Sequence, residues 1–223
     1  MLITRRRTSA ACLLAAAAFA LTACGSGSGG SDDSGSDKIS GAEVAGSKSP
    51  SVDPSASEAP EKGAPAFDLP QDVTVEIDKA RTGDPKGDAL LRDVGYSAKA
   101  QIEAFAKGDG YTANMQRYYT GSASPYLGKG VKKYWDGGRT VTGKYSYYGF
   151  QVIDLKENVA TARYCEDQRN AFGKEIKTGK VDKGAASKND FVETKIEAAK
   201  NSKGDWQVRQ FELKKAAETC VRD

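Results

Sequence analysis

The chain has 223 residues, with 33 Lys and Arg against 30 Asp and Glu, no His and four Cys. The absence of histidine excludes Ser–His and Cys–His nucleophile pairs, His-ligated zinc and an imidazole that titrates near neutral pH. The sequence also lacks a Gly-x-Ser-x-Gly elbow and a phosphate-binding Gly-Lys-Ser/Thr loop. We therefore predict no metal and no cofactor.

Residues 1–23 are predicted to be a signal peptide. Arg5–Arg7 form a basic start, and residues 10–21 form an apolar run that is too short to span a bilayer as a helix, which needs about 20 residues. The run Leu-Thr-Ala-Cys at residues 21–24 resembles the bacterial lipobox. This resemblance implies that Cys24 receives a diacylglycerol and becomes the mature N-terminus. An ordinary secretion signal is the alternative, and the export route, Sec or twin-arginine, stays open.

The signal peptide carries three arginines and no acid, so the mature chain has equal numbers of basic and acidic residues. This balance gives no argument for a nucleic-acid partner. Residues 24–65 are predicted to be a disordered tether, because 23 of the 41 residues after Cys24 are Gly, Ser or Pro and none is aromatic. We interpret the tether as a spacer; a segment that folds on a partner is the alternative.

Residues 66–223 are predicted to form one α+β domain, with helices in its first half. The pair Asp84-Pro85 predicts a helix start, and apolar residues at spacings of three and four predict a helix over 85–107. Two shorter helices are expected over 112–119 and 124–135.

The rest of the domain is predicted to be mainly strands. Alternating or β-branched and aromatic residues predict strands at 73–78, 145–155, 159–166, 191–199 and 206–213. A bulge near Arg209 is expected in the last strand, because the apolar alternation changes phase there. The polar stretch 170–189 is expected to be a long mobile hairpin connection.

Three features resemble the NTF2-like or SnoaL-like cone fold. They are the long helix before Lys107, the short aromatic helices up to Trp135 and the closing run GDWQVRQFEL. More narrowly, Cys165 in the run TARYC and Cys220 just after the last predicted strand resemble the cysteines of secreted actinobacterial proteins with this fold. The resemblance implies N-terminal helices packed on a curved antiparallel sheet that encloses a pocket. An open antiparallel sheet with helices on one face is the alternative.

Two cysteines, Cys165 and Cys220, stay in the exported domain once Cys12 is removed and Cys24 is acylated. An oxidising compartment makes a disulfide between them the expected state. A zinc pair or a redox couple is disfavoured, because the chain has no His and no Cys-x-x-Cys motif.

Aromatic residues near the short helices and in the strand 145–155 are candidate ligand contacts. Tyr and Trp combine apolar area with a polar group, which suits a small apolar or glycan ligand. The candidates are Tyr119, Tyr126, Tyr134, Trp135 and Tyr148. The alternative is that these side chains form the core. Basic residues interleaved with these aromatic residues are a candidate contact for an anionic polymer: Lys129, Lys132, Lys133, Arg139 and Lys144. The alternative is that they form an ordinary solvent-exposed helix face.

Carboxylates are the remaining candidates for chemistry. Asp136, Asp154 or Glu103 beside a tyrosine could act as a general base without histidine. Glu166 and Asp167 are adjacent in a strand and point to opposite faces, so they cannot act as a pair. We expect both to be surface charges at a strand end.

Two functions are compatible with these patterns. The first is a non-catalytic lipoprotein on the extracytoplasmic face of the cell membrane. It would be held to the lipid bilayer by acyl chains on Cys24 and bind a small ligand or an envelope protein, not a nucleic acid. The alternative is a small isomerase or dehydratase with a buried carboxylate and a tyrosine. A buried carboxylate of raised pKa beside a tyrosine hydroxyl would distinguish the two.

Overall fold

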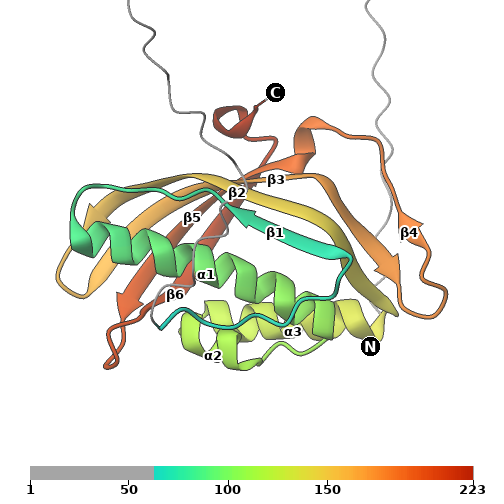
Figure 1. The fold of residues 1–223 in the computed structure, drawn as a ribbon, viewed down its shortest axis with the longest axis horizontal. Helices are drawn as coiled ribbons and strands as arrows, with labels where there is room; N and C mark the ends of the chain where they lie inside the picture. The colour runs from blue at the N-terminus through green and yellow to red at the C-terminus, as the bar shows by residue number, and fades with distance from the viewer. Residues whose placement is uncertain (1–62, 223) are drawn as a thin grey trace, which may run out of the picture. The chain divides into compact units, whose positions relative to one another are not determined.

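Helices cover one face of a curved sheet in the computed structural model, which describes residues 63–222 (Figure 1). The predicted signal peptide, Cys24 and nearly all of the predicted tether lie outside these residues. The described helices are α1 (Pro85–Lys107), α2 (Ala113–Tyr118) and α3 (Ala123–Asp136), with short 3-10 turns at Lys188–Asp190 and Glu218–Cys220. The described strands are β1 (Val73–Ile77), β2 (Arg139–Leu155), β3 (Val159–Glu175), β4 (Val181–Asp182), β5 (Phe191–Lys200) and β6 (Trp206–Lys215). The α+β class, with helices packed on one curved sheet, is confirmed.

The long helix α1 has the bounds that the sequence predicts. The Asp84 carboxylate accepts a hydrogen bond from the backbone N–H of Gly87 at 3.1 Å, and Pro85 occupies the first turn. The helix ends at Gly108, whose backbone N–H bonds the Ala104 carbonyl. Its apolar stripe is almost completely buried and joins the main core: Leu91, Val94, Ala98 and Ile102.

The sheet is mixed, because β1 pairs in parallel with β2 while all other neighbouring strands in the order β1-β2-β3-β5-β6 are antiparallel. The prediction of a purely antiparallel sheet is wrong at this edge. All three helices lie between β1 and β2 in the chain, and so long a connection allows a parallel crossover. The short strand β4 pairs only with the end of β3.

Two glycines bend β2 and give the sheet its curvature. Gly143 and Gly149 have φ values of 91° and 63°, which are conformations that side-chain-bearing residues rarely adopt. The pairing of β2 with β3 shifts between Lys144 and Ser146 and again between Tyr148 and Gln151. Bulges of this kind bend a strand and increase its twist. The helices pack in the hollow that results (Figure 1).

The prediction of a mobile connection over 170–189 is wrong for its first third. β3 continues to Glu175, and Asn170–Glu175 pair with Arg139–Lys144 of β2. β4 then adds a short pairing to β3. The polar composition of this segment hides the strand, because its stability comes from partners that are distant in sequence.

The β5–β6 hairpin and its bulge are confirmed. Glu197 pairs with Gln210 and Ala198 with Val208, so Arg209 is the extra residue on β6. Trp206 and Val208 are buried before the bulge. The bulge turns Phe211 toward the same side, where it packs against the main core.

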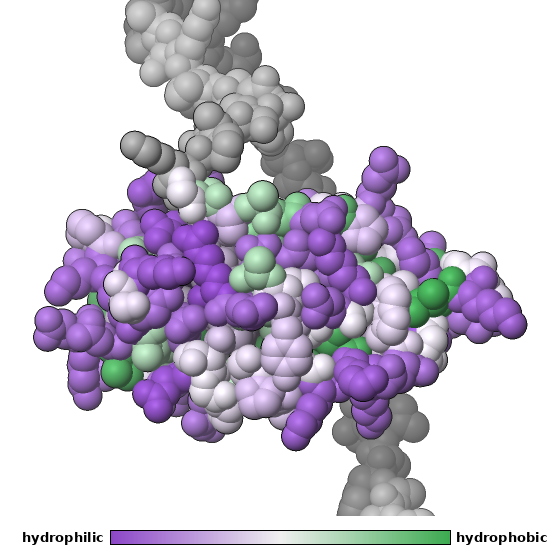
Figure 2. All heavy atoms as spheres, turned by 90° about the horizontal axis from the view of Figure 1, so that it is seen from below, coloured by the Kyte–Doolittle hydropathy of each residue, from purple (hydrophilic) through white to green (hydrophobic). Residues whose placement is uncertain are grey.

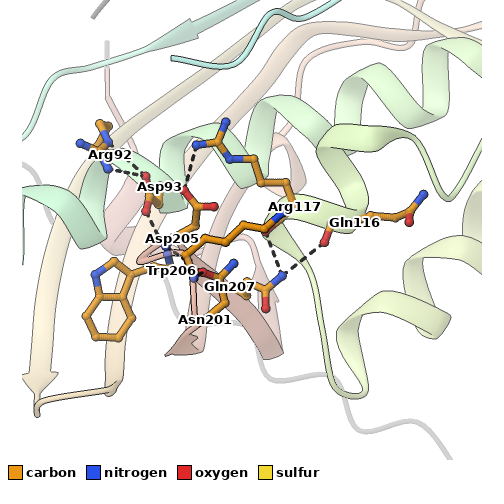
Figure 3. Close-up of polar contacts among 9 residues, drawn as sticks. Arg92, Asp93, Gln116, Arg117, Asn201, Asp205, Trp206 and Gln207 are labelled. Atoms are coloured by element: carbon orange, nitrogen blue, oxygen red, sulfur yellow. Dashed lines mark hydrogen bonds and ion pairs between the residues drawn. The ribbon is translucent and has the colours of Figure 1, made fainter. Parts of the chain in front are cut away.

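A polar network joins this hairpin to α1 and α2 (Figure 3). The buried Asp93 carboxylate accepts a hydrogen bond from the Trp206 backbone N–H at 2.9 Å and pairs with Arg92. Arg117 pairs with Asp205 at 2.8 Å. Burial raises the pKa of Asp93 despite these favourable contacts. The network holds the hairpin against the helices, away from the cavity described next.

Candidate functional site

A cavity of about 550 Å³ lies between the helices and the sheet. Its volume is within the range of small-molecule sites. Helix residues at its wall come from α1 and α3, and strand residues come from β2, β3, β5 and β6. Most of the wall is apolar or aromatic: Phe105, Tyr119, Tyr126, Leu127, Tyr147, Tyr164, Val192, Ile196, Val208, Phe211 and Leu213. The cavity therefore offers an apolar interior with few polar groups.

Glu166 is the one acidic residue of the cavity wall and is only 8% exposed. The Tyr147 hydroxyl donates a hydrogen bond to its Oε1 at 3.0 Å. Burial raises the pKa of Glu166, because removing a carboxylate from water disfavours its charged form. Hydrogen bonds from Gln168 and Tyr147 oppose this shift but do not cancel it. The site thus holds a carboxyl group that accepts a proton more readily than one in water.

The charge of this carboxyl group acts on four buried tyrosines. Burial raises the pKa of Tyr119, Tyr145, Tyr147 and Tyr164, and the charge of Glu166 raises it further in each case. Their hydroxyls are therefore neutral hydrogen-bond donors at physiological pH. Tyr119 donates to the Ser97 carbonyl oxygen at 3.0 Å, and Tyr147 donates to Glu166.

One row of cross-strand partners carries the polar groups of the cavity. Tyr147 of β2 lies opposite Glu166 of β3, Glu166 opposite Val192 of β5, and Val192 opposite Lys215 of β6. All four residues line the cavity. Directly opposed residues project from the same face of a sheet. The row therefore places a hydroxyl, a carboxyl, an apolar group and an ammonium side by side along one wall.

The expectation that Glu166 and Asp167 are surface charges is wrong. Both are buried, on opposite faces as their adjacency requires: Glu166 faces the cavity, whereas Asp167 pairs with Arg169 at 2.9 Å. The signal for Glu166 is present in the alternation of β3, because Glu166 has the phase of the buried Ala162 and Tyr164. An acidic residue in an inward phase marks a buried carboxyl group.

The three carboxylates named as candidate bases lie elsewhere. Asp136 and Asp154 are exposed and pair with neighbouring lysines. Glu103 is buried, but it does not line the cavity as its α1 neighbours Gln101 and Phe105 do, and its oxygens accept hydrogen bonds from Asn114 and the Asp68 backbone N–H. None of the three lines the cavity.

The five aromatic candidates separate into two groups. Tyr119 and Tyr126 line the cavity, and the exposed Tyr126 meets Phe211 edge to face at 5.5 Å between ring centroids. Tyr134, Trp135 and Tyr148 do not line it. The Tyr134 ring packs on Phe105. Tyr148 lies on the opposite face of β2 from Tyr147, because neighbours in a strand alternate.

The predicted Cys165–Cys220 disulfide is confirmed. It lies with Phe191 and Ala217 in a small second core, against which Tyr148 packs. The Tyr148 hydroxyl donates to the Cys220 carbonyl oxygen, and the Arg222 guanidinium lies 3.8 Å from the Tyr148 ring centroid. The disulfide thus fixes the last described residues to β3, directly beside Glu166 in the chain.

Substitution Glu166→Gln is expected to stabilise the protein at neutral and basic pH. The folded state binds the Glu166 proton more tightly than the unfolded state, so its contribution to stability is complete below the unfolded pKa near 4.5 and falls as pH rises through the folded pKa. Glutamine keeps a hydrogen-bond acceptor for Tyr147 and does not ionise. Thermal melts of the full chain should show a Tm gain of more than about 2 °C at pH 8 that disappears at pH 4.

The exposed Glu212→Gln on β6 is the matched control and should give no pH-dependent gain. A Glu166→Gln gain that is equal at pH 4 and pH 8 would contradict the burial argument.

Within residues 63–222, no group of three or more Cys, Asp or Glu side chains is arranged to hold a metal ion. None of the described helices is long and apolar enough to span a membrane.

Comparison with known proteins finds no matching family model and no matching curated protein. Solved structures match at low identity. A ketosteroid isomerase-like protein from Erwinia carotovora atroseptica is 17% identical, with 57% of this chain and 96% of that chain covered and a TM-score of 0.38. A putative ketosteroid isomerase from Shewanella frigidimarina is 12% identical, with 58% and 98% covered and a TM-score of 0.31.

The intermembrane space region of chloroplast protein ARC6 is also similar, at 12% identity, with 56% and 92% covered and a TM-score of 0.37. At these scores no statement about function follows from the similarity.

Proposed function

We propose that this protein is a lipid-anchored, extracytoplasmic binding protein whose cavity holds a small, largely apolar ligand. The cavity carries this proposal, because it combines about 550 Å³ of space, apolar walls and one buried carboxyl group beside a tyrosine hydroxyl. Apolar walls supply affinity, and a few fixed polar groups select and orient a ligand. The lipobox-like run at residues 21–24 supports the anchor.

The chemistry of Glu166 defines what the interior accepts. A protonated carboxyl group both donates and accepts a hydrogen bond, and neutral tyrosine hydroxyls do the same. A carbonyl or hydroxyl group on the ligand could form hydrogen bonds with the Glu166 carboxyl group and the Tyr147 hydroxyl. An anionic group placed beside Glu166 would be repelled whenever this carboxyl group ionises.

The face that Figure 2 shows favours a small ligand over a partner protein as the bound molecule. Hydrophilic residues dominate the outline of this face, and hydrophobic residues appear as separate small groups. Stable protein interfaces form on larger continuous apolar patches. An envelope protein as partner is therefore the less favoured of the two binding functions.

Substitution Cys24→Ala is expected to release the protein from the membrane. Two or more acyl chains anchor a protein stably, and no acyl chain can attach without the Cys24 thiol. Fractionation of cells that express each form should place the natural protein with membranes and the variant in the soluble fraction. The serine substitution of Cys12, which lies inside the predicted signal peptide, is the matched control and should leave anchoring unchanged. Continued anchoring of Cys24→Ala would overturn the lipoprotein proposal.

Native mass spectrometry of the full chain, gently extracted from its own membranes, is expected to show a bound small molecule. Substitution Val192→Phe adds volume in the middle of the cavity wall and should abolish this adduct. Val181→Phe on β4, outside the cavity, is the control. An adduct that survives Val192→Phe would contradict the cavity assignment, and a co-isolated protein in its place would favour the partner function.

A second function, proton transfer on a bound ligand, is favoured by one observation. Glu166 meets the criterion of a buried carboxylate with raised pKa beside a tyrosine hydroxyl. In this function Glu166 would remove a proton next to a ligand carbonyl, and a tyrosine would donate to the developing oxyanion. Incubation of the released ligand with protein in deuterium oxide should then label that carbon, and Glu166→Gln should stop labelling. No labelling by the natural protein would leave binding alone.

A further inference from the structure

The mouth of the cavity carries three lysines. Lys129 and Lys133 are one helical turn apart on α3, and Lys215 is the last residue of β6. All three are exposed, and all three line the cavity. Positions four apart on a helix face the same side, so Lys129 and Lys133 present their ammonium groups together.

These lysines have no carboxylate partner within the described part of the chain. The neighbouring Lys132 differs, because it points away from the cavity and pairs with Asp136 at 2.8 Å. Glu166 is the only acid in the cavity wall, and it is buried under the apolar residues. Three like charges around one opening therefore face a cavity with no exposed counter-charge.

The cross-strand row of Tyr147, Glu166, Val192 and Lys215 separates the Lys215 ammonium group from the Glu166 carboxyl group. Lys215 is two strands away from Glu166 on the same face, which is about 10 Å at the usual strand spacing of about 4.8 Å. Val192 fills the position between them. A ligand that spans the row meets ammonium groups at the opening, an apolar middle, and the Glu166 carboxyl group with the Tyr147 hydroxyl inside.

We propose that the ligand is an amphipathic anion. Its carboxylate, phosphate or sulfonate group lies at Lys129, Lys133 and Lys215, and its apolar body points inward and ends in an uncharged polar group near Glu166 and Tyr147. This inference deepens the proposed binding function and rests on it. An anion in the reverse direction would bring its charge to the buried carboxyl group and leave the lysines unpaired.

Two dyes with the same fused-ring body test this polarity. The anionic 1-anilinonaphthalene-8-sulfonate and the neutral N-phenyl-1-naphthylamine are titrated by fluorescence into the oxidised mature chain, residues 24–223, prepared without acylation so that no detergent competes. The anionic dye is expected to bind about tenfold more tightly at low salt. The triple variant K129Q/K133Q/K215Q should lose this preference, with binding of the neutral dye unchanged and the Tm retained.

The substitution Lys132→Gln on the same helix is the matched control and should keep the preference. Equal affinities of the natural chain for both dyes, or a triple variant that keeps the preference, would overturn the anionic ligand. Failure of both dyes to bind would overturn the binding function itself. If the triple variant does not fold, the single substitution Lys215→Gln replaces it and should lower the preference several-fold.

A membrane lipid and a soluble acid share this chemistry, and competition separates them. Dodecanoate should displace the anionic dye at lower concentration than dodecanol if a soluble acid is bound. Phosphatidylglycerol vesicles should displace it where phosphatidylcholine vesicles do not if the source is a lipid. Equal displacement by dodecanoate and dodecanol, together with equal displacement by the two vesicles, would contradict recognition of the anion.

Discussion

Removal of the Cys165–Cys220 disulfide is expected to lower the free energy of unfolding by about 4 kcal/mol. The two cysteines are 55 residues apart in sequence, and a covalent loop of this length restricts the unfolded chain by about that amount on the chain-entropy account. Ala217 and Cys220 are completely buried. Without the disulfide, the C-terminal segment that carries them can detach from the small second core around Cys165 and Phe191. The expected drop in Tm is roughly 8–16 °C for a chain of this size.

Thermal melts of the natural chain and of the double alanine variant at both cysteines measure this loss. Reduction of the natural chain should reproduce the lower Tm of the variant, and the reductant should leave the variant unchanged. Substitution Tyr148→Phe is a smaller companion change, because it removes only the hydroxyl that bonds the Cys220 carbonyl. A reduced chain that melts at the temperature of the oxidised chain would contradict a stabilising role of the disulfide.

Substitution Gly143→Ala is expected to destabilise the protein by about 3 kcal/mol or more. A methyl group at this position would lie 2.2 Å from the backbone oxygen of Asn170, which belongs to the paired strand and cannot move alone. The φ of 91° adds backbone strain on the order of 1–3 kcal/mol for a residue with a side chain. Gly143 also donates its backbone N–H to the Asp72 carbonyl at 2.8 Å, so displacement here would disturb β1 as well.

Substitution Gly149→Ala separates the backbone strain at positive φ from the steric overlap with the neighbouring strand. Its φ of 63° is left-handed as well, but a methyl group there meets nothing closer than the Cys165 sulfur at 3.7 Å. The Gly149→Ala variant should therefore lose only about 1–2 kcal/mol of unfolding free energy, which is the cost of a left-handed backbone for a residue with a side chain. Urea unfolding of both variants measures the difference. Equal losses at Gly143 and Gly149 would show that steric overlap with β3 does not determine the cost at Gly143.

The helices and the β5–β6 hairpin could be predicted because their signals are local. Asp84 and Pro85 mark the start of α1 within one turn, and the bulge at Arg209 follows from a phase change within β6 itself. The parallel strand β1 and the polar end of β3 could not be predicted in the same way. Both are held by β2, whose paired residues lie 70 positions from β1 and between 26 and 36 positions from the polar end of β3.

The candidate site shows the same division. The aromatic pattern predicts five ligand contacts, of which Tyr119 and Tyr126 line the cavity, whereas Glu166 at a strand end is predicted to be a surface charge because carboxylates are usually exposed. The alternation of β3 places Glu166 inward, but alternation alone does not show that the facing space is a cavity. That property depends on the bends in β2 and on the position of α3, which are tertiary features.

The cross-strand row from Tyr147 to Lys215 has a consequence for how such a protein can change over evolutionary time. Each of its four positions belongs to a different strand, so a single substitution can alter one group without turning the others. New ligand preferences are therefore reachable by point changes on an unchanged backbone. A one-residue insertion inside β3 would instead send every later side chain to the opposite face. Lineages of this domain should vary freely at Val192 and Lys215 while keeping the length of β3 constant.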